Sequence, residues 1–338
     1  MNFNVHGSFE TSSFGRLSEL FIQALLEDGN QVRAVPHDVG YGDFVKSQSD
    51  LSDTVRHHLG TPLSDAKNLA IYPIGWPFFK NAAKADFVFT LWETDKLPSC
   101  AVKVLNGRPK VATANAWNHK VFRTSGIKKA ISIIPLGIDK AYVPSVDLPY
   151  GRTFITMGRL GSGPQRKGIT RAISAFLLAA DECPEIQLLV KTTKHTQIEF
   201  THQRIKYIAA DCPLENMVKL YQSGFCYLSG VTSEGWGWHQ HEAMACGLPL
   251  IAVKWGGLQT FWPGNKAGWE VKYDIVPAHD KFHQVGNWTD PSVSDMARHM
   301  VEAAKAPRNT YEKGKEALKA VEPFTLENMF KAIIKFVS

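Results

Sequence analysis

The feature that most constrains the fold is the regular alternation of short apolar runs with amphipathic helical patterns along the whole chain. Such alternation is typical of a parallel sheet whose two faces are covered by helices, and it predicts an α/β fold. At the start of the chain, residues 2–6 are predicted to form a strand. Apolar residues then recur at helical spacing until Gly29, which is expected to end the first helix.

The length of the chain, 338 residues, indicates two domains of ordinary size. Two prolines interrupt the alternation in a stretch without periodicity, which predicts a linker over residues 141–152. We therefore expect a doubly wound N-terminal domain over residues 1–140 and a second doubly wound domain over residues 153–322. Residues 323–338 are predicted to form a C-terminal helix with an apolar stripe.

Composition excludes several classes of protein. Hydrophobic residues make up 44% of the chain and charged residues 21%, as in globular proteins with sizeable cores. The five cysteines lie far apart without a CxxC pair, so neither a disulfide framework nor a zinc knuckle is indicated. No charged-then-apolar leader is evident, and no apolar run approaches the roughly 18 residues of a membrane span. We expect a cytoplasmic protein, with peripheral contact to a membrane surface left open.

The net charge of +6 is mild, but its distribution is uneven. No acidic residue lies between Asp95 and Asp139, whereas the segment 96–129 is basic. Its eight cationic residues are Lys96, Lys103, Arg108, Lys110, Lys120, Arg123, Lys128 and Lys129. A solvated surface is the ordinary explanation for such a run, and a surface for a polyanionic acceptor is the alternative.

The first candidate site is a glycine-rich loop that follows a predicted strand over residues 153–157 and precedes a predicted helix. Gly158 and Arg159 begin this loop, and Lys167 and Gly168 end it. A loop of this kind presents backbone N–H groups and the positive end of a helix dipole to an anion, and the two cations add to that charge. The GxxxxGK[ST] order of a P-loop is absent. The pattern predicts a diphosphate site, although such loops are also common on protein surfaces.

The second candidate site contains two carboxylates eight positions apart, Glu234 and Glu242. Gly235 and Gly237 bracket Trp236 and would let the backbone approach a ligand closely. Glu234 would accept hydrogen bonds from sugar hydroxyls beside the N–H groups of the following helix. Glu242, on that helix, would sit deeper, where a carboxylate suits a ribose diol.

The second motif, EGWG followed by HEAMACGLP, resembles the E-x7-E donor motif of retaining glycosyltransferases of family four, the sucrose-synthase and mannosyltransferase class. Gly158-Arg159 and Lys167-Gly168 are similar to the diphosphate-binding residues of that family. Residues 134–139 resemble its interdomain segment, and residues 9–15 correspond to its first glycine-containing loop. The resemblance covers most of the chain. It implies the GT-B fold, with two Rossmann-like domains that face a central cleft and a C-terminal helix that crosses back to the first domain.

The resemblance also implies roles for individual residues. Arg159, Lys167 and Glu234 would be catalytic. The donor-binding set would comprise Gly15, Gly158, Arg159, Lys167, Glu234, Gly235, Trp236, Gly237 and Glu242. Many members of the family place a histidine from the first domain at the sugar, whereas this chain has Trp92 and Glu93 at the corresponding strand end. We expect these two residues to contact the acceptor or the sugar.

The mechanism that the resemblance implies is transfer with retention of anomeric configuration through an oxocarbenium-like transition state. The leaving diphosphate would help to take the acceptor proton. The co-substrate would be a UDP-sugar or a GDP-sugar, with no cofactor and no metal. The sequence agrees, because no DxD lies at a predicted strand end, and two cations with a helix dipole supply comparable electrostatic stabilisation.

Alternatives to this interpretation concern a metal site, the acceptor and the class of function. His239 and His241 are two positions apart, so they would point to different sides of a helix, and no third metal ligand is nearby in the sequence. For the acceptor, a glycan or lipid-linked saccharide is favoured, with hydroxylated bases of DNA bound through the segment 96–129 as an alternative. A non-catalytic module that binds nucleotide-sugars or polyanions is a different class of function. Such a module would not need all four of Arg159, Lys167, Glu234 and Glu242.

Overall fold

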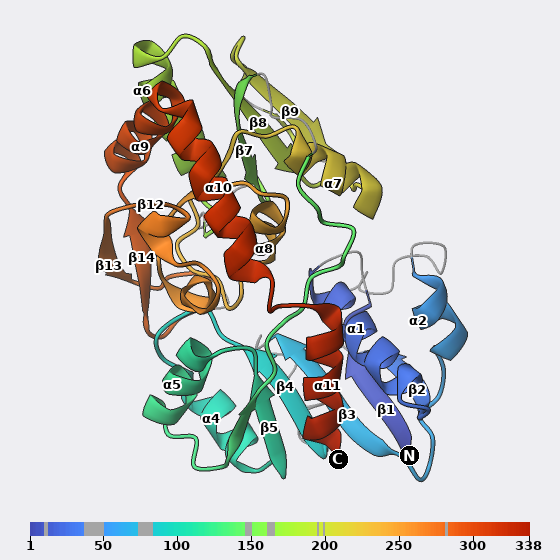
Figure 1. Ribbon diagram of the computed structural model, residues 1–338. Helices are drawn as coiled ribbons and strands as arrows, with labels where there is room; N and C mark the ends of the chain where they lie inside the picture. The colour runs from blue at the N-terminus through green and yellow to red at the C-terminus, as the bar shows by residue number, and fades with distance from the viewer. Residues whose placement is uncertain are drawn as a thin grey trace. The chain divides into compact units, whose positions relative to one another are not determined.

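The computed structural model describes residues 1–9, 13–36, 51–73, 84–145, 151–160, 166–194, 196–198, 200–280 and 283–338. These residues form two compact units, each built around its own parallel sheet (Figure 1). The first unit comprises Met1–Gly137, residues 283–286 and Leu326–Ser338, and the second comprises Ile138–Asp280 and Asn287–Thr325.

The first unit contains a six-stranded sheet in the order β2-β1-β3-β4-β5-β6, and its neighbouring strands are parallel. The strands are β1 (Asn2–Gly7), β2 (Gln31–Pro36), β3 (Lys67–Pro73), β4 (Phe87–Leu91), β5 (Lys110–Thr113) and β6 (Ile131–Ile133). The central strand β4, with the sequence FVFTL, is apolar along almost its whole length and buried on both faces, as expected of a parallel sheet covered on both sides.

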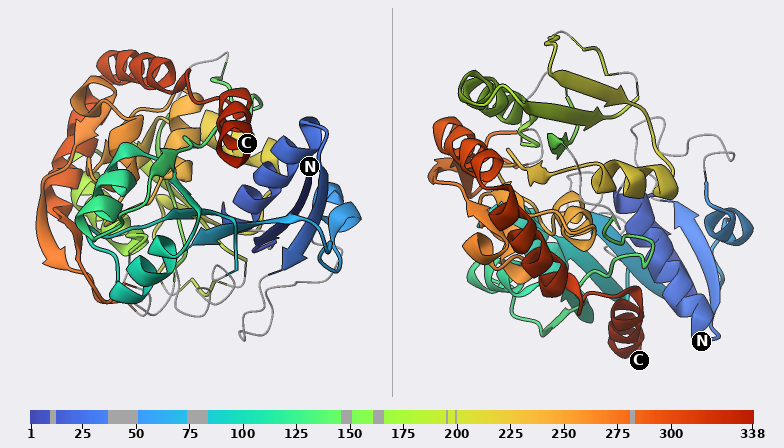
Figure 2. Two further views of the ribbon diagram at one scale, coloured as in Figure 1. Left: turned by 90° about the horizontal axis from the view of Figure 1, so that it is seen from below. Right: turned by 45° about the horizontal axis from the view of Figure 1, so that its top comes forward.

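Helices cover both faces of the first sheet. They are α1 (Ser13–Glu27), α2 (Asp53–His58), α4 (Ser99–Asn106), α5 (Ala116–Thr124) and α11 (Leu326–Val337). Alternate residues of β4 divide between the faces: Phe87 packs on Phe336 of α11 and Phe89 on Phe21 of α1, whereas Val88 belongs to the core under α4 and α5. The first and last helices, α1 and α11, therefore share one face, where they lie side by side (Figures 1 and 2).

The second unit contains a six-stranded sheet in the order β12-β11-β10-β7-β8-β9. Its strands are β7 (Arg152–Met157), β8 (Ile186–Thr192), β9 (Ile205–Ala209), β10 (Cys226–Leu228), β11 (Leu250–Ala252) and β12 (Gly268–Glu270). A separate antiparallel pair is formed by β13 (Tyr273–Pro277) and β14 (Asn287–Pro291). The helices are α6 (Ile169–Glu182), α7 (Leu214–Gln222), α8 (Trp238–Ala245), α9 (Val293–Lys305) and α10 (Pro307–Val321), with short 3-10 turns at Gly256–Thr260 and Gly264–Lys266.

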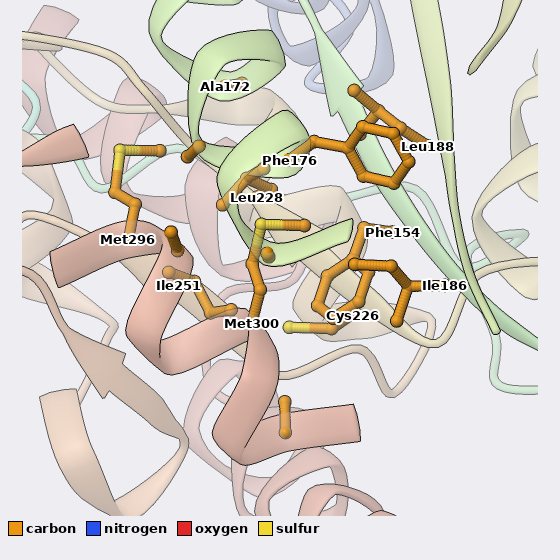
Figure 3. Close-up of a cluster of buried hydrophobic side chains, with 14 of the residues drawn as sticks. Phe154, Ala172, Phe176, Ile186, Leu188, Cys226, Leu228, Ile251, Met296 and Met300 are labelled. Atoms are coloured by element: carbon orange, nitrogen blue, oxygen red, sulfur yellow. The ribbon is translucent and has the colours of Figure 1, made fainter. Parts of the chain in front are cut away.

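The main core of the second unit lies between its sheet and the helix pair α6 and α9. Figure 3 shows Met296 and Met300 of α9 directed toward α6 and the central strands, where Phe154 and Phe176 supply aromatic rings. On the other side, α8 packs against α10. This packing holds the strand ends in place, and the loops that leave those ends carry both sequence motifs.

The division into units differs in detail from the expected domain limits of 1–140, 141–152, 153–322 and 323–338. Ile138 belongs to the second unit because it pairs with Thr325. Residues 283–286 belong to the first unit, because His283 contacts Glu93 and Thr94 donates to the Val285 carbonyl. The C-terminal helix α11 belongs to the first unit. Residues 146–150 of the expected linker lie outside the described residues.

In the described part of the chain, no helix has both the length and the apolar character needed to cross a bilayer.

Candidate functional site

Both sequence motifs leave the same edge of the second sheet. The first follows β7 and the second follows β10, and these two strands are parallel neighbours. From β7 the chain continues through β8 and β9 on one side of the sheet and then returns to form β10 on the other side. The carboxyl ends of β7 and β10 therefore lie at the point where the strand order reverses, which is where ligands bind in open α/β sheets.

Two helices begin at this edge with a left-handed glycine in place of a side-chain cap. Gly168 precedes α6 with φ of 62°, and Gly237 precedes α8 with φ of 98°, and neither start has a side-chain cap hydrogen bond. A Cβ on Gly168 would overlap the carbonyl of Gly230, so only glycine lets the two motif loops approach each other this closely. Both helices thus start without a side-chain cap, and helix N-termini of this kind favour anions.

The loop that contains Glu234 is fixed from behind by backbone contacts. Gly257 N–H donates to the Glu234 carbonyl at 2.8 Å, and Thr289 of β14 donates to the Thr232 carbonyl from both its N–H and its hydroxyl. Gly256, with φ of 64°, has no room for a Cβ because the Glu234 carbonyl lies against it. The loop is therefore rigidly held, which suits a site that must present a carboxylate in one geometry.

Glu234 forms the centre of a charged cluster. Lys167 Nζ lies 2.5 Å from Glu234 Oε1, and Arg166 Nη1 lies 3.4 Å from Oε2. Arg166 also donates to the Ser233 carbonyl at 3.0 Å, which anchors its guanidinium to the loop. The Glu234 side chain is 11% exposed and that of Lys167 is 32% exposed. Because two cations surround one carboxylate, the cluster has positive charge to offer an anionic ligand.

The loop carries two further polar groups. The hydroxyls of Thr232 and Ser233 are buried and, among the described residues, have no hydrogen-bond partner.

Gly158 and Arg159 stand at the start of the other loop, directly after β7. Arg159 is exposed and forms no ion pair within the described part of the chain, so its guanidinium is accessible to a ligand. Residues 161–165, in the middle of this loop, lie outside the described residues.

Glu242 is held in a different manner. It lies on α8, is almost fully buried, and accepts a hydrogen bond from the Tyr221 hydroxyl of α7 at 2.8 Å. His239 Nδ1 lies 3.3 Å from the same hydroxyl and 3.5 Å from Glu242 Oε2. Burial, and then the charge of Glu242, raise the pKa of Tyr221 well above its ordinary value, so this phenol stays protonated and acts as a donor.

Trp236, a member of the expected donor-binding set, has a buried side chain. Its indole is 3% exposed and packs against the rings of His241, Phe261 and Phe324, while its Nε1 donates to His241 Nδ1 at 3.1 Å. Any contact of Trp236 with a ligand must therefore come from its backbone. His241 is enclosed in this aromatic cluster and His239 faces Glu242. Among the described residues no group of histidine, cysteine and carboxylate side chains forms a metal site.

The sequence-predicted residues of the first unit lie at the carboxyl end of β4 and in α1. Trp92 is buried, and its Nε1 donates to Thr94 Oγ1 at 2.6 Å and to the Lys96 carbonyl at 2.7 Å. Glu93 is partly exposed and its Oε2 lies 3.2 Å from His283 Nε2. Trp92 thus has a packing role, whereas Glu93 keeps a reachable carboxylate. Gly15 is buried in the first turn of α1, and residues 10–12 before it lie outside the described residues.

Three residues with functional geometry were missed by the sequence analysis: Arg166, Tyr221 and His283. Arg166 had a usable signal, since it directly precedes Lys167. Tyr221 and His283 had none, because they reach their carboxylate partners, Glu242 and Glu93, from distant segments of the chain.

The basic segment 96–129 comprises α4, β5, α5 and the adjoining loops of the first unit. Every one of its cations is exposed except Arg108, which is half-buried. Lys103 and Arg123 are in the last turns of α4 and α5, where positive charge favours the helix dipole. This structural role accounts for part of the positive charge of the segment. That an anionic partner binds the remaining cations stays a prediction.

Two surface hollows lie in the second unit. One, of about 430 Å³, is largely apolar and is lined in part by Phe225, Leu248 and Pro249, close to the amino ends of β10 and β11. It therefore lies toward the edge of the sheet opposite the motif loops. The other, of about 650 Å³, is open and is lined in part by Arg171 and Asp290. Neither is lined by Lys167, Glu234 or Glu242.

Comparison with solved structures decides the fold. Sucrose-phosphate synthase from Thermosynechococcus elongatus matches with a TM-score of 0.71 and 15% identity, over 100% of this chain and 98% of that one. Anabaena HepE, solved in complex with UDP and glucose, matches with a TM-score of 0.69 and 15% identity, over 100% and 99% of the two chains. The fold is that of GT-B glycosyltransferases. WaaG, a glycosyltransferase involved in lipopolysaccharide biosynthesis, matches with a TM-score of 0.66 and 14% identity, over 100% and 99%.

The sequence comparison points to the same class. Residues 151–281 match the family model of glycosyl transferases group 1, and this stretch contains both sequence motifs. No curated protein sequence shows significant similarity to the chain. The GT-B fold predicted from the sequence is thus confirmed, and the second unit is similar to a group 1 glycosyl transferase domain.

Proposed function

We propose that the chain is a retaining glycosyltransferase of family four that moves a sugar from a nucleotide diphosphate sugar to an acceptor hydroxyl without a metal ion. The observation that carries the proposal is the cluster of Glu234, Lys167 and Arg166 between two helices that start at uncapped glycines. A carboxylate for sugar hydroxyls and cations for a diphosphate stand together at the switch point of the sheet. The match of this region to group 1 glycosyl transferases supports the same reading.

The proposed roles follow from the contacts. The N–H groups at the starts of α6 and α8, with Arg159, Lys167 and Arg166, bind the diphosphate. Glu234 exchanges its contact with the cations for hydrogen bonds to the sugar, and Gly235 and Gly237 let the backbone come close. In the structure Glu234 contacts the same two cations, Lys167 and Arg166, to which the proposal assigns the diphosphate.

In the proposed reaction the bond between the anomeric carbon and the diphosphate oxygen breaks as the acceptor oxygen bonds to the same face of the sugar. The acceptor proton passes to the departing diphosphate oxygen. Positive charge fixed beside the diphosphate stabilises the negative charge that builds there, which is the largest catalytic contribution expected from such a site. The HepE structure holds UDP and glucose, which supports a UDP-sugar ahead of a GDP-sugar as donor.

For the acceptor we propose a glycan or a lipid-linked saccharide. The exposed cations of segment 96–129 are in the first unit, and Glu93 supplies a carboxylate there that can accept from acceptor hydroxyls. Transfer to hydroxylated DNA bases remains an outcome of an acceptor screen. It would show itself as binding to DNA that weakens steeply with added salt.

The test is to incubate the protein with UDP-, GDP- and ADP-sugars in EDTA and to measure release of free nucleotide, with wild type beside Glu234→Gln. We expect one donor to be hydrolysed, and the variant to lose about 10²-fold or more in rate. The variant should still bind the free nucleotide at least as tightly, because Lys167 and Arg166 are no longer engaged by a carboxylate. Glu215→Gln, at an exposed carboxylate on α7, is the matched control and should behave as wild type.

Failure to hydrolyse or bind any donor would overturn the proposal, as would a strict requirement for a divalent metal. Tight binding of a nucleotide-sugar without any turnover, with or without acceptors, would instead favour the non-catalytic binding module.

A further inference from the structure

The two motif carboxylates, eight positions apart, have partners of different chemistry. Glu234 contacts two cations. Glu242 Oε2 contacts the hydroxyl of Tyr221 and the ring of His239, which comes from the same helix. A site balanced by cations suits an anion, whereas a carboxylate aligned by a phenol suits a ligand that itself brings hydrogen-bond donors.

The contacts around Glu242 form a directed chain of hydrogen bonds. The Tyr221 hydroxyl has one proton, and the 2.8 Å contact assigns it to Glu242 Oε2. The oxygen of Tyr221 is then the acceptor for His239 Nδ1–H at 3.3 Å. Each bond in such a chain polarises the next, and together they restrict the rotamer of the carboxylate.

Tyr221 is itself immobilised. Its ring is fully buried on α7 and is flanked by the rings of Tyr142 at 6.0 Å and Tyr227 at 6.3 Å between centroids. The hydroxyl therefore has a fixed position from which to hold the carboxylate. The ligand that such a group fits is a vicinal diol, because its two O–H groups can both donate to one carboxylate.

We propose that Tyr221 is the positioning residue that aligns Glu242 for the 2′- and 3′-hydroxyls of the donor ribose, and that the site thereby selects ribonucleotides over 2′-deoxyribonucleotides. This inference rests on the proposed function. A deoxyribonucleotide brings one hydroxyl fewer to this buried carboxylate. A site built around a hydroxyl rejects the analogue that lacks it for this reason.

The test is to measure dissociation constants for ribo- and deoxyribonucleoside diphosphates of the same base: UDP and dUDP, GDP and dGDP, ADP and dADP. For the base that binds, we expect the wild type to prefer the ribonucleotide by about 10- to 100-fold, as for loss of one hydrogen bond to a charged group. In Tyr221→Phe the preference should fall to about fivefold or less, because the carboxylate loses its alignment but not its charge. The ratio is the readout, since a general loss of packing would weaken both nucleotides alike.

Two further variants separate positioning from folding. Tyr227→Phe removes a neighbouring buried phenol and should leave the ratio unchanged. Glu242→Gln should lower ribonucleotide affinity toward that of the deoxyribonucleotide while the melting temperature stays near wild type. Equal binding of both nucleotides by the wild type, or an unchanged ratio in a folded Tyr221→Phe protein, would overturn the inference and leave the proposed function standing. Absence of binding by any diphosphate would count against the proposed function itself.

Discussion

Replacing Lys167 with methionine is expected to slow release of nucleotide from a saturating nucleotide-sugar by about 10²- to 10³-fold. Lys167 directly precedes the uncapped start of α6, and its Nζ lies 2.5 Å from Glu234. Its charge would stabilise the departing diphosphate more strongly than the bound donor, so its loss should appear mainly in kcat. Methionine keeps the apolar stem of the side chain and so preserves its packing. The measurement is kcat for donor hydrolysis, with a thermal melt to confirm folding.

The matched control is Lys305→Met. Lys305 ends α9 and pairs with Glu182 at 2.6 Å, with both side chains more than half exposed. A surface pair of this kind contributes little, and the rate should stay within about twofold of wild type. A folded Lys167→Met protein that releases nucleotide at the wild-type rate would contradict the role assigned to this residue.

The second large effect is expected from Gly168→Ala. Gly168 has φ of 62°, which costs an alanine roughly 1–2 kcal/mol, and the new Cβ would overlap the carbonyl of Gly230. Relief of that overlap must move one of the two motif loops, at a further cost of about 1–3 kcal/mol. We expect the second unit to lose about 2–5 kcal/mol of unfolding free energy and the protein to lose donor binding. Denaturant unfolding and nucleotide titration would measure the two effects.

Gly29→Ala separates the steric effect from the backbone effect. Gly29 has φ of 76° and open space around its Cβ position, so it incurs only the left-handed cost of about 1–2 kcal/mol. Equal destabilisation by the two substitutions would show that the close approach of Gly168 to Gly230 is not a constraint.

Much of the fold and part of the site were predictable because they depend on local patterns. Alternating strands and helices predicted the α/β class, and glycines beside basic and acidic residues predicted both motif loops. Glu234 and Lys167 were assigned from different motifs, and the structure brings them into contact. The order of the two motifs along the chain was sufficient to assign both residues to one site, because the loops after β7 and β10 share one edge of the sheet.

The rest depends on tertiary packing that no local pattern records. The motif placed Trp236 in the donor-binding set without fixing its ring, and only the folded chain shows that the ring packs against Phe261 and Phe324, where a large apolar surface is buried. Tyr221 lies on a helix whose apolar pattern is an ordinary one, so nothing in the sequence distinguishes it from a core residue. Only the folded chain brings its hydroxyl to Glu242. Residues 283–286 join the first unit through His283, a contact between positions that are far apart in the sequence.

We propose above all that the two motif loops bind a nucleoside diphosphate without a metal ion. The most direct measurement is calorimetric titration of the wild-type protein with UDP and GDP, once in EDTA and once in Mg²⁺. We expect one nucleotide to bind per chain, with the same affinity in both buffers and much weaker binding in Arg159→Ala and Lys167→Met. Failure of either nucleotide to bind, or binding that appears only with Mg²⁺, would contradict it.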